Sequence, residues 1–241
     1  LPSIYRRTLA REDRVSLSSA TRVLVNSCYS RESVYRIYGV DATVCYLGVD
    51  TETFRPLPAA KGNYLLSVGM VNPHKGYDFV LRSLALIAPN ERPPLVICGN
   101  AADAYETAYL RRLAVELNVQ VDLRTLVTDA ELVTLYNGAL LTVYAPVMEP
   151  FGLVALESMA CGTPVVGVRE AGVRETVVDG VTGLLVDRDA AAFAEALRGL
   201  LAHHDLRASM GSAARAHVEQ HWTWPQTDAR LEQILSAVWQ G

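Results

Sequence analysis

The sequence predicts a doubly wound α/β fold, in which helices cover both faces of a parallel sheet. From residue 63 onward, short apolar runs such as YLLSVG (64–69) alternate with segments whose apolar residues follow helical spacing. Unbroken apolar runs are typical of strands buried on both faces, and regular alternation with helices is typical of parallel sheets. The chain has 241 residues, 50% of them hydrophobic, which is enough for one large domain or somewhat more.

The first 63 residues show a looser pattern. We expect a charged helix (1–20), a strand (21–27), a helix (29–38), a second strand (42–47) and a linker rich in turn formers (48–63). Ser27 is placed to cap the second of these helices, because a serine side chain accepts hydrogen bonds from free helical amides. Gly39 is expected to end that helix in the left-handed conformation.

The rest of the chain contains the repeating pattern. The expected strands are 64–69, 94–99, 119–123, 139–146, 163–168 and 183–187. The expected helices are 77–88, 103–117, 129–136 (opened by Thr128 or Asp129), one between 152 and 162, 172–178, 189–202, 205–220 and 224–239. Doubly wound sheets bind ligands outside the carboxyl ends of their strands, so function is expected in the loops that follow strands. These loops are 69–76, 99–103, 123–129 and 145–152.

The loop PVMEPFG (146–152) follows a strand and opens a helix. The free amides of Phe151, Gly152 and Leu153 would point at one spot, and a helix N-terminus is a suitable site for a phosphate. Glu157 shares a helix face with Leu153 one turn further in. A carboxylate there could accept two hydrogen bonds from a vicinal diol, as an acidic residue does for ribose in dinucleotide-binding folds.

An alternative for this segment is a capped core helix on which Glu149 and Glu157 are merely solvated. Two features count against that alternative. The apolar residues of the segment leave little exposed surface, and Pro150 fixes the way the chain enters the helix. Gly162 is expected to end the helix in the left-handed conformation before the next strand.

The loop GMVNPHKG (69–76) carries Lys75, one of only two lysines in the chain; the other is Lys61. Cations are favoured at the C-terminal ends of helices, so the helix dipole does not explain a lysine near a helix start. A diphosphate bound in front of the helix would explain it. The alternative is an ordinary surface lysine, and the signal gains weight only in combination with the loop 146–152.

Several other functional classes lack their sequence signals. No GxGxxG follows the first strand, no GxxxxGK[ST] is present, and no GxSxG elbow is present. The net charge of −4 gives no basic face for nucleic acid, and no apolar run is long enough to span a membrane. The four cysteines (Cys28, Cys45, Cys98, Cys161) are scattered, which indicates reduced thiols in a cytosolic protein.

The stretch EPFGLVALESMACGTPVV (149–166) resembles the signature of retaining GT-B glycosyltransferases of the large family 4. That signature carries two glutamates separated by seven residues, matching Glu149 and Glu157. The segments YLLSVGMVNPHKGYDFVLRSLALI, TDAELVTLYNGALLTVYAP and EAGVRETVVDGVTGLLVD are also similar to family segments. The resemblance covers nearly the whole chain and implies a GT-B type, Rossmann-like donor domain.

The resemblance also implies a division of the chain. Residues 1–56 would be the end of an N-terminal acceptor domain and the linker, residues 57–222 the nucleotide-sugar-binding domain, and residues 223–241 the return helix. Because the chain lacks an initiator methionine, it is expected to be a C-terminal fragment of a longer enzyme. Such a fragment would bind nucleotide but would not transfer sugar.

The family's residue roles carry over to matching positions. Glu149 would contact hydroxyls of the donor sugar, and Lys75 would neutralise the leaving diphosphate. Glu157 would hold the ribose hydroxyls. Further donor contacts would come from the backbone amides of Phe151, Gly152 and Leu153 and from Thr163 near the diphosphate. No metal or other cofactor is implied, because cationic side chains and helix dipoles would do the work of Mg²⁺.

One position departs from the family pattern. Many relatives carry arginine directly after the glycine of the first strand, where this chain has Met70. Loss of a charge-assisted hydrogen bond costs about 1.5–3 kcal/mol, so either donor binding is weaker or another residue substitutes. The candidates are Asn72, His74 and Arg169.

The implied function is transfer of a hexose from a UDP- or GDP-sugar to a hydroxyl acceptor, with retention. The acceptor would be a saccharide, a lipid-linked or a small molecule, and no nucleic acid is expected as a partner. The implied location is cytoplasmic, with room for peripheral association at the inner face of the membrane. The alternative is a nucleotide-sugar-binding module without catalytic activity.

Overall fold

The computed structural model describes residues 2–58 and 61–239 and contains a six-stranded, all-parallel sheet. Its strands are β3 (Leu65–Val68), β4 (Leu95–Gly99), β5 (Val121–Thr125), β6 (Leu141–Tyr144), β7 (Val165–Val168) and β8 (Gly183–Val186). They lie in the order β5-β4-β3-β6-β7-β8, so the chain starts in the middle, winds to one edge, and returns to wind to the other. The expected doubly wound α/β architecture is therefore confirmed.

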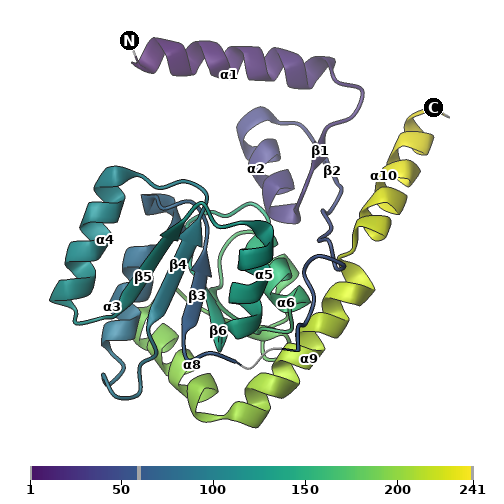
Figure 1. The fold of residues 1–241 in the computed structure, drawn as a ribbon. Helices are drawn as coiled ribbons and strands as arrows, with labels where there is room; N and C mark the ends of the chain where they lie inside the picture. Colours follow the sequence, from purple (N-terminus) through teal and green to yellow (C-terminus); the bar gives the residue numbers. More distant parts are fainter. Residues whose placement is uncertain (1, 59–60, 240–241) are drawn as a thin grey trace.

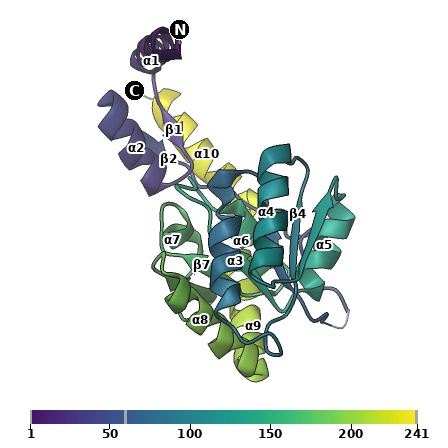
Figure 2. The ribbon, with the colours of Figure 1, turned by 90° about the vertical axis from the view of Figure 1, so that its left-hand side faces the viewer.

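Helices cover both faces of the sheet, as Figure 1 shows for α3 and α4 on one side of the strands and α5 and α6 on the other. One layer contains α3 (Tyr77–Ala85), α4 (Ala104–Glu116) and α8 (Ala190–Ala202), which are prominent in Figure 2. The other contains α5 (Asp129–Gly138), α6 (Leu153–Ala160) and α9 (His204–His221). Alternate strand residues separate the two cores: Leu65 packs in the first layer, while Leu66 packs against α5.

The N-terminal part forms a smaller unit beside the end of the chain (Figure 1). It comprises α1 (Pro2–Ser19), β1 (Leu24–Val25), α2 (Cys28–Tyr38) and β2 (Thr43–Val44), and it lies near α10 (Trp224–Trp239). The strands β1 and β2 pair only with each other within the described chain and are two residues long, much shorter than the expected 21–27 and 42–47. A strand that pairs with only one neighbour makes few inter-strand hydrogen bonds, so little stabilises a longer strand here. The proposed divisions at 56/57 and 222/223 remain predictions.

The sequence signals for helix ends are confirmed where they can be checked. The Ser27 side chain accepts from the Ser30 amide, and Thr128 forms a capping box with Glu131 at the start of α5. Gly39 and Gly162 are both left-handed, with φ of 71°. Other boundaries differ by a few residues: α3 ends at Ala85 and not at 88, β5 runs two residues later than expected, and α5 is two residues longer.

Within residues 2–58 and 61–239, no helix is both long enough and apolar enough to cross a membrane.

Candidate functional site

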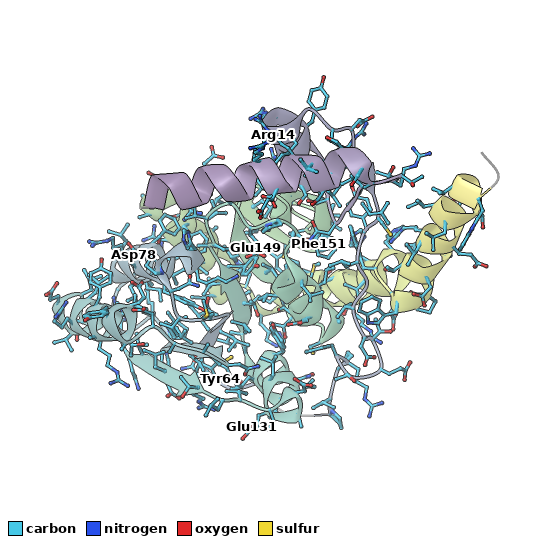
Figure 3. The ribbon with its side chains drawn as sticks, turned by 90° about the horizontal axis from the view of Figure 1, so that it is seen from above. Arg14, Tyr64, Asp78, Glu131, Glu149 and Phe151 are labelled. Carbon is cyan, nitrogen blue, oxygen red and sulfur yellow. The ribbon has the colours of Figure 1, made fainter. Side chains whose placement is uncertain are left out.

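The site lies where the strand order of the sheet reverses. Loops 69–76 and 145–152 follow the neighbouring strands β3 and β6, from which the chain winds in opposite directions. In doubly wound sheets this switch point is the place where ligands bind. Viewed from above, Glu149 and Phe151 lie near the middle of the molecule, with Asp78 of α3 towards one side (Figure 3).

The two loops are in direct contact. The amide of Val147 donates to the carbonyl of His74 at 2.7 Å. Gly76 is left-handed, with φ of 67°, and a Cβ added to it would lie 2.1 Å from the carbonyl oxygen of Ala145. Only glycine allows the backbones to approach so closely. The segment Pro73–Lys75 forms a 3₁₀ turn that the sequence did not predict, so Lys75 ends this turn and does not lie in α3.

This contact brings Lys75 and Glu149 together. The Nζ atom of Lys75 donates to Oε2 of Glu149 at 2.8 Å, although 74 positions separate the two residues in the sequence. Their side chains are only 23% and 21% exposed. A cation and a carboxylate therefore occupy one partly buried place at the switch point.

The backbone on either side of Glu149 is held by other loops. Its carbonyl accepts from the amide of Gly172 at 3.0 Å, and the next carbonyl, of Pro150, accepts from Oγ of Ser27 at 2.6 Å. Met148 is left-handed with φ of 56°, an unusual conformation for a residue with a side chain. Tyr144 lies beside Glu149, and its pKa is raised by burial and then by that carboxylate.

Helix α6 points its N-terminus into the same region. Gly152 is its N-cap, with φ of 99° and no side chain to occupy the end of the helix. The first amides bonded back to the Gly152 carbonyl are those of Ala155 and Leu156, so the preceding amides of Leu153 and Val154 face outward from the helix end. The side chain of Phe151 is buried and belongs to the core, so the ligand contact expected of this residue remains a prediction about its backbone amide.

Glu157 lies one turn further along α6, and Oε2 of its carboxylate accepts from the hydroxyl of Tyr136 at 2.8 Å. Burial raises the pKa of Glu157 to about 7, while the hydrogen bond from Tyr136 acts in the opposite direction. Near neutral pH this carboxyl is therefore balanced between its two protonation states.

Thr163 does not belong to this group of residues. It precedes β7 at the amino ends of the strands, whereas the site lies at their carboxyl ends. Its buried hydroxyl donates to the Tyr136 carbonyl and accepts from Nζ of Lys61, both at 2.7 Å. The expectation that Thr163 lies near a diphosphate is wrong, because α6 crosses the full depth of the sheet before Gly162 reverses the chain.

The three candidates to replace the missing arginine have different surroundings. Met70 itself is 48% exposed at the edge of the site. Arg169 is engaged elsewhere, since its guanidinium donates to Asp179 at 2.5 Å and to the Leu185 carbonyl. His74 is exposed, and Oδ1 of Asn72 is buried without a hydrogen-bond partner in the described residues. No cation from these positions joins Lys75.

Three residues of the site's framework gave no recognisable sequence signal, namely Tyr136, Glu175 and Arg188. The sequence predicted Ser27 as a helix cap but not its contact with the Pro150 carbonyl. Arg188 illustrates why: its guanidinium donates to the carbonyls of Ala145 and Pro146 and to Glu170, fixing the end of β6 from another strand's loop. Such contacts join distant segments, so no local spacing announces them. Among the described residues, no group of three or more histidine, cysteine or acidic side chains is arranged to hold a metal ion.

The chain matches a known protein family along most of its length. The sequence pattern of the family described as "Glycosyl transferases group 1" matches residues 49–217. This chain belongs to the group 1 glycosyltransferases. A D-inositol 3-phosphate glycosyltransferase of Acidothermus cellulolyticus is 35% identical over 259 aligned residues, covering 98% of this chain and 56% of the relative. A protein of the same name from Mycolicibacterium paratuberculosis is 35% identical over 92% of this chain and 54% of its own length.

This chain therefore spans about half the length of these curated relatives. Among solved structures, sucrose-phosphate synthase from Thermosynechococcus elongatus is similar with a TM-score of 0.84 and 27% identity, covering 97% of this chain and 62% of that one. Anabaena HepE in complex with UDP-glucose has a TM-score of 0.87 at 22% identity, covering 98% and 70%.

A third similar structure is the C-terminal domain of a group 1 family protein, LpcC from Francisella tularensis. It has a TM-score of 0.63 at 22% identity, and the match covers 73% of this chain and 99% of that domain. The predicted GT-B type, Rossmann-like fold and the resemblance to a C-terminal half are confirmed by these matches.

Proposed function

We propose that this chain is the nucleotide-sugar-binding half of a retaining, family 4 type glycosyltransferase, which moves a hexose from a UDP- or GDP-sugar to a hydroxyl acceptor. The observation that carries the proposal is the Lys75–Glu149 pair, held at the switch point beside the N-terminus of α6. Cations and free backbone amides bind phosphates, and a carboxylate binds sugar hydroxyls. A cation, free amides and a carboxylate all lie within two adjoining loops.

Each of these groups would bind a different part of the donor. Lys75 and the amides at the start of α6 would bind the diphosphate, and Gly152 would let the diphosphate approach the backbone closely. Glu149 would accept hydrogen bonds from hydroxyls of the hexose and orient its anomeric carbon. Glu157, deeper along α6, would hold the ribose hydroxyls.

The base would lie against the loop after β5, at residues 126–128. Leu126 there is left-handed, with φ of 59°, and its side chain is 80% exposed. The amides of Leu126 and Thr128 already donate to the Gly99 carbonyl and to the Glu131 side chain, so the base would be recognised through the amide of Val127 and the carbonyls of Leu126 and Val127.

In the proposed reaction, the acceptor oxygen forms a bond to the anomeric carbon while the bond from that carbon to the diphosphate oxygen breaks. The departing nucleoside diphosphate takes the acceptor's proton, and attack on the same face retains the configuration. No protein nucleophile is required. Lys75 and the α6 dipole would stabilise the negative charge that builds on the leaving phosphate, without a metal ion.

The acceptor would be bound mainly by parts of the protein outside this chain. The curated relatives are named D-inositol 3-phosphate glycosyltransferases, so D-inositol 3-phosphate is the first acceptor to test. A cleft that positions the acceptor and excludes water would need both the donor domain and the N-terminal acceptor domain. We therefore expect the 241-residue chain to bind nucleotide without transferring sugar.

Calorimetric titration of this chain with UDP, GDP and ADP, with and without EDTA, tests the binding part. We expect one of the three to bind, with EDTA making no difference. Lys75→Ala should weaken this binding by about tenfold or more, because it removes a charge-assisted contact to phosphate. Arg82→Ala, an exposed cation on α3, is the control and should have no effect.

The transfer reaction is tested in a version extended to the length of the relatives. Glu149→Ala should abolish hexose transfer there, and near-normal activity of both Glu149→Ala and Lys75→Ala would contradict the assignment. The alternative, a binding module that no longer catalyses, predicts nucleotide binding but no turnover in the extended protein with any hydroxyl acceptor. The exposed Met70 in place of arginine is the feature that favours this alternative.

A further inference from the structure

The hydroxyl of Tyr136 is directed at a single acceptor. Tyr136 lies in α5, is fully buried, and donates to Oε2 of Glu157 at 2.8 Å. Phe54 packs edge-on against its ring, with the ring centroids 6.0 Å apart. A phenylalanine would fill the same space and would not need a buried hydrogen-bond partner. The hydroxyl therefore contributes more than packing.

No other hydrogen-bond donor bonds to the Glu157 side chain among the described residues. The ionisable groups that face it from the packed elements are Tyr136 and Asp129 on α5, Tyr144 on β6, Cys98 on β4 and Cys161 on α6. None of them is a cation. The orientation and the charge of Glu157 thus depend on one neutral hydroxyl.

Tyr136 is itself held by contacts at the amino ends of the strands. Its carbonyl accepts from Oγ1 of Thr163, which in turn accepts from Nζ of Lys61. The next residue, Asn137, bonds through its side chain to the carbonyl of Arg55 and the amide of Leu57. These contacts fix the end of α5 against the linker, so the tyrosine ring has a rigid base.

We propose that Tyr136 is a positioning residue, which holds the Glu157 carboxylate in place and ionised for binding the ribose hydroxyls of the nucleotide. This inference rests on the proposed function. One carboxylate oxygen takes the tyrosine hydroxyl, and the remaining lone pairs are directed to the vicinal diol. Tyr136 touches no ligand and acts only through Glu157.

The effect of Tyr136 on Glu157 has a definite sign. A hydrogen bond to the carboxylate favours its ionised form, against the burial that disfavours it. The ionised carboxylate accepts hydrogen bonds on both oxygens, whereas protonation turns one oxygen into a donor and weakens its contacts with the two ribose hydroxyls. Removing the tyrosine hydroxyl should therefore raise the pKa of Glu157 and shift the pH dependence of nucleotide binding to higher pH.

The test compares Tyr136→Phe with Tyr64→Phe, measured by calorimetry from pH 5.5 to 9. Tyr64 is a matched control, because its hydroxyl also bonds to α5, at the Leu135 carbonyl, but not to Glu157. The probe is whichever of UDP, GDP and ADP binds the unsubstituted chain. For a rise of about one pKa unit, the loss of affinity in Tyr136→Phe should be about fivefold larger at pH 7 than above about pH 9, and the loss that remains above pH 9 measures the positioning of the carboxylate. Tyr64→Phe should follow the unsubstituted chain.

A second ligand separates positioning from general damage to the fold. The 2′,3′-dideoxy form of the same nucleotide lacks the hydroxyls that Glu157 would hold, so Tyr136→Phe should bind it as the unsubstituted chain does. Equal losses for both nucleotides would show a merely structural role and overturn the inference. An unchanged pH profile would overturn it as well, while leaving the proposed function intact. Absence of binding by all three nucleotides in the unsubstituted chain would overturn the proposed function and this inference with it.

A gentler substitution covers the case in which Tyr136→Phe does not fold. Replacing Tyr136 by 3-fluorotyrosine makes the hydroxyl a stronger donor and leaves the ring in place. The pKa of Glu157, followed by carbon NMR of its carboxyl group, should then fall. A rise or no change would contradict the inference without reference to any ligand.

Discussion

Glu157 combines two properties that oppose each other, because it is ionisable and largely buried. Its pKa is raised from 4.5 to about 7 by burial, so the folded chain keeps a proton that the unfolded chain has already lost between these pH values. When the folded state binds more protons, stability falls as pH rises. The residue proposed to hold ribose therefore lowers the free energy of unfolding near neutral pH. Functional residues commonly reduce stability in this way.

Glu157→Gln should show this cost directly. The variant should unfold like the unsubstituted chain near pH 4.5 and be more stable by about 1–3 kcal/mol at pH 8, because it avoids ionising a buried carboxyl. Urea unfolding across this pH range measures the difference, and a constant difference would contradict the argument.

Glu131→Gln is a control of opposite sign. The capping hydrogen bonds from Thr128 lower the pKa of Glu131, so its stabilising effect is present at neutral pH and lost as pH falls.

Gly76 is the residue on which the contact between the two site loops depends. Gly76→Ala should destabilise the fold by about 2–4 kcal/mol, since its Cβ would overlap the Ala145 carbonyl and its φ is positive. Gly199→Ala in the middle of α8 is the control, because nothing lies within 4 Å of the added Cβ. It should leave stability unchanged or raise it by about 0.5–1 kcal/mol. Urea unfolding compares the two, and similar losses in both would rule out the loop contact as the cause.

At the scale of elements, the N-terminus of α2 is attached to the loops of the site. Ser27 caps this helix and also donates to the Pro150 carbonyl, one residue from Glu149. The carboxylate of Glu175, in α7 (Val173–Thr176), accepts from the amides of Cys28 and Tyr29 at 2.8 and 3.0 Å. A carboxylate at a helix N-terminus is favoured by free amides and by the helix dipole. Residues 24–47 are thereby linked to the loop that carries Glu149.

Glu175→Gln should loosen this attachment without unfolding the main sheet. An amide can offer only one oxygen to two N–H groups, so the local cost should be about 1–2 kcal/mol. Hydrogen–deuterium exchange should accelerate in residues 24–47 and stay unchanged in β3, β4 and β6. Glu32→Gln makes the same charge change on the exposed face of α2, where its one ion-pair partner among the described residues is Arg36, and should have little effect. Faster exchange throughout the sheet in Glu175→Gln would contradict a local attachment.

Helix signals were predictable from sequence because their causes lie within a few residues. The caps at Ser27 and Thr128 and the left-handed Gly39 and Gly162 needed only local spacing. The 3₁₀ turn before Gly76 was missed. The glycine that ends it packs against the carbonyl of Ala145, on another strand's loop, and no local spacing reveals that contact. The lengths of β1 and β2 were overestimated for a related reason, since a strand's length depends on its neighbours.

At the scale of the whole molecule, an aromatic cluster joins the site loop to the segments that flank the main sheet. Trp222, between α9 and α10, lies 5.6 Å from Phe151 and 5.2 Å from Tyr46 by ring centroids. Its indole N–H donates to Nε2 of His217, whose pKa is lowered by burial and by His221, so that the ring stays neutral and able to accept. One side chain therefore connects three distant parts of the chain.

Trp222→Ala should cost about 3–5 kcal/mol of stability, as expected for truncation of a buried aromatic residue. Trp239→Ala near the end of α10 is the matched control, because that side chain is 84% exposed. It should change the free energy of unfolding by less than about 0.5 kcal/mol. Thermal and urea unfolding measure both variants. A small effect at Trp222 would show that the flanking segments are held by other contacts.

The sequence by itself determined the alternation of strands and helices, and it predicted the carboxyl-end loops as the place of the proposed site and Lys75, Glu149 and Glu157 as its members. These follow from local periodicity, turn residues and family motifs, all of which are written in neighbouring positions. Only the tertiary structure decided that Lys75 meets Glu149, that Tyr136 meets Glu157, and that Thr163 lies at the opposite end of the sheet. The reason is that strand order sets which loops adjoin, and strand order depends on packing between segments that no local pattern relates.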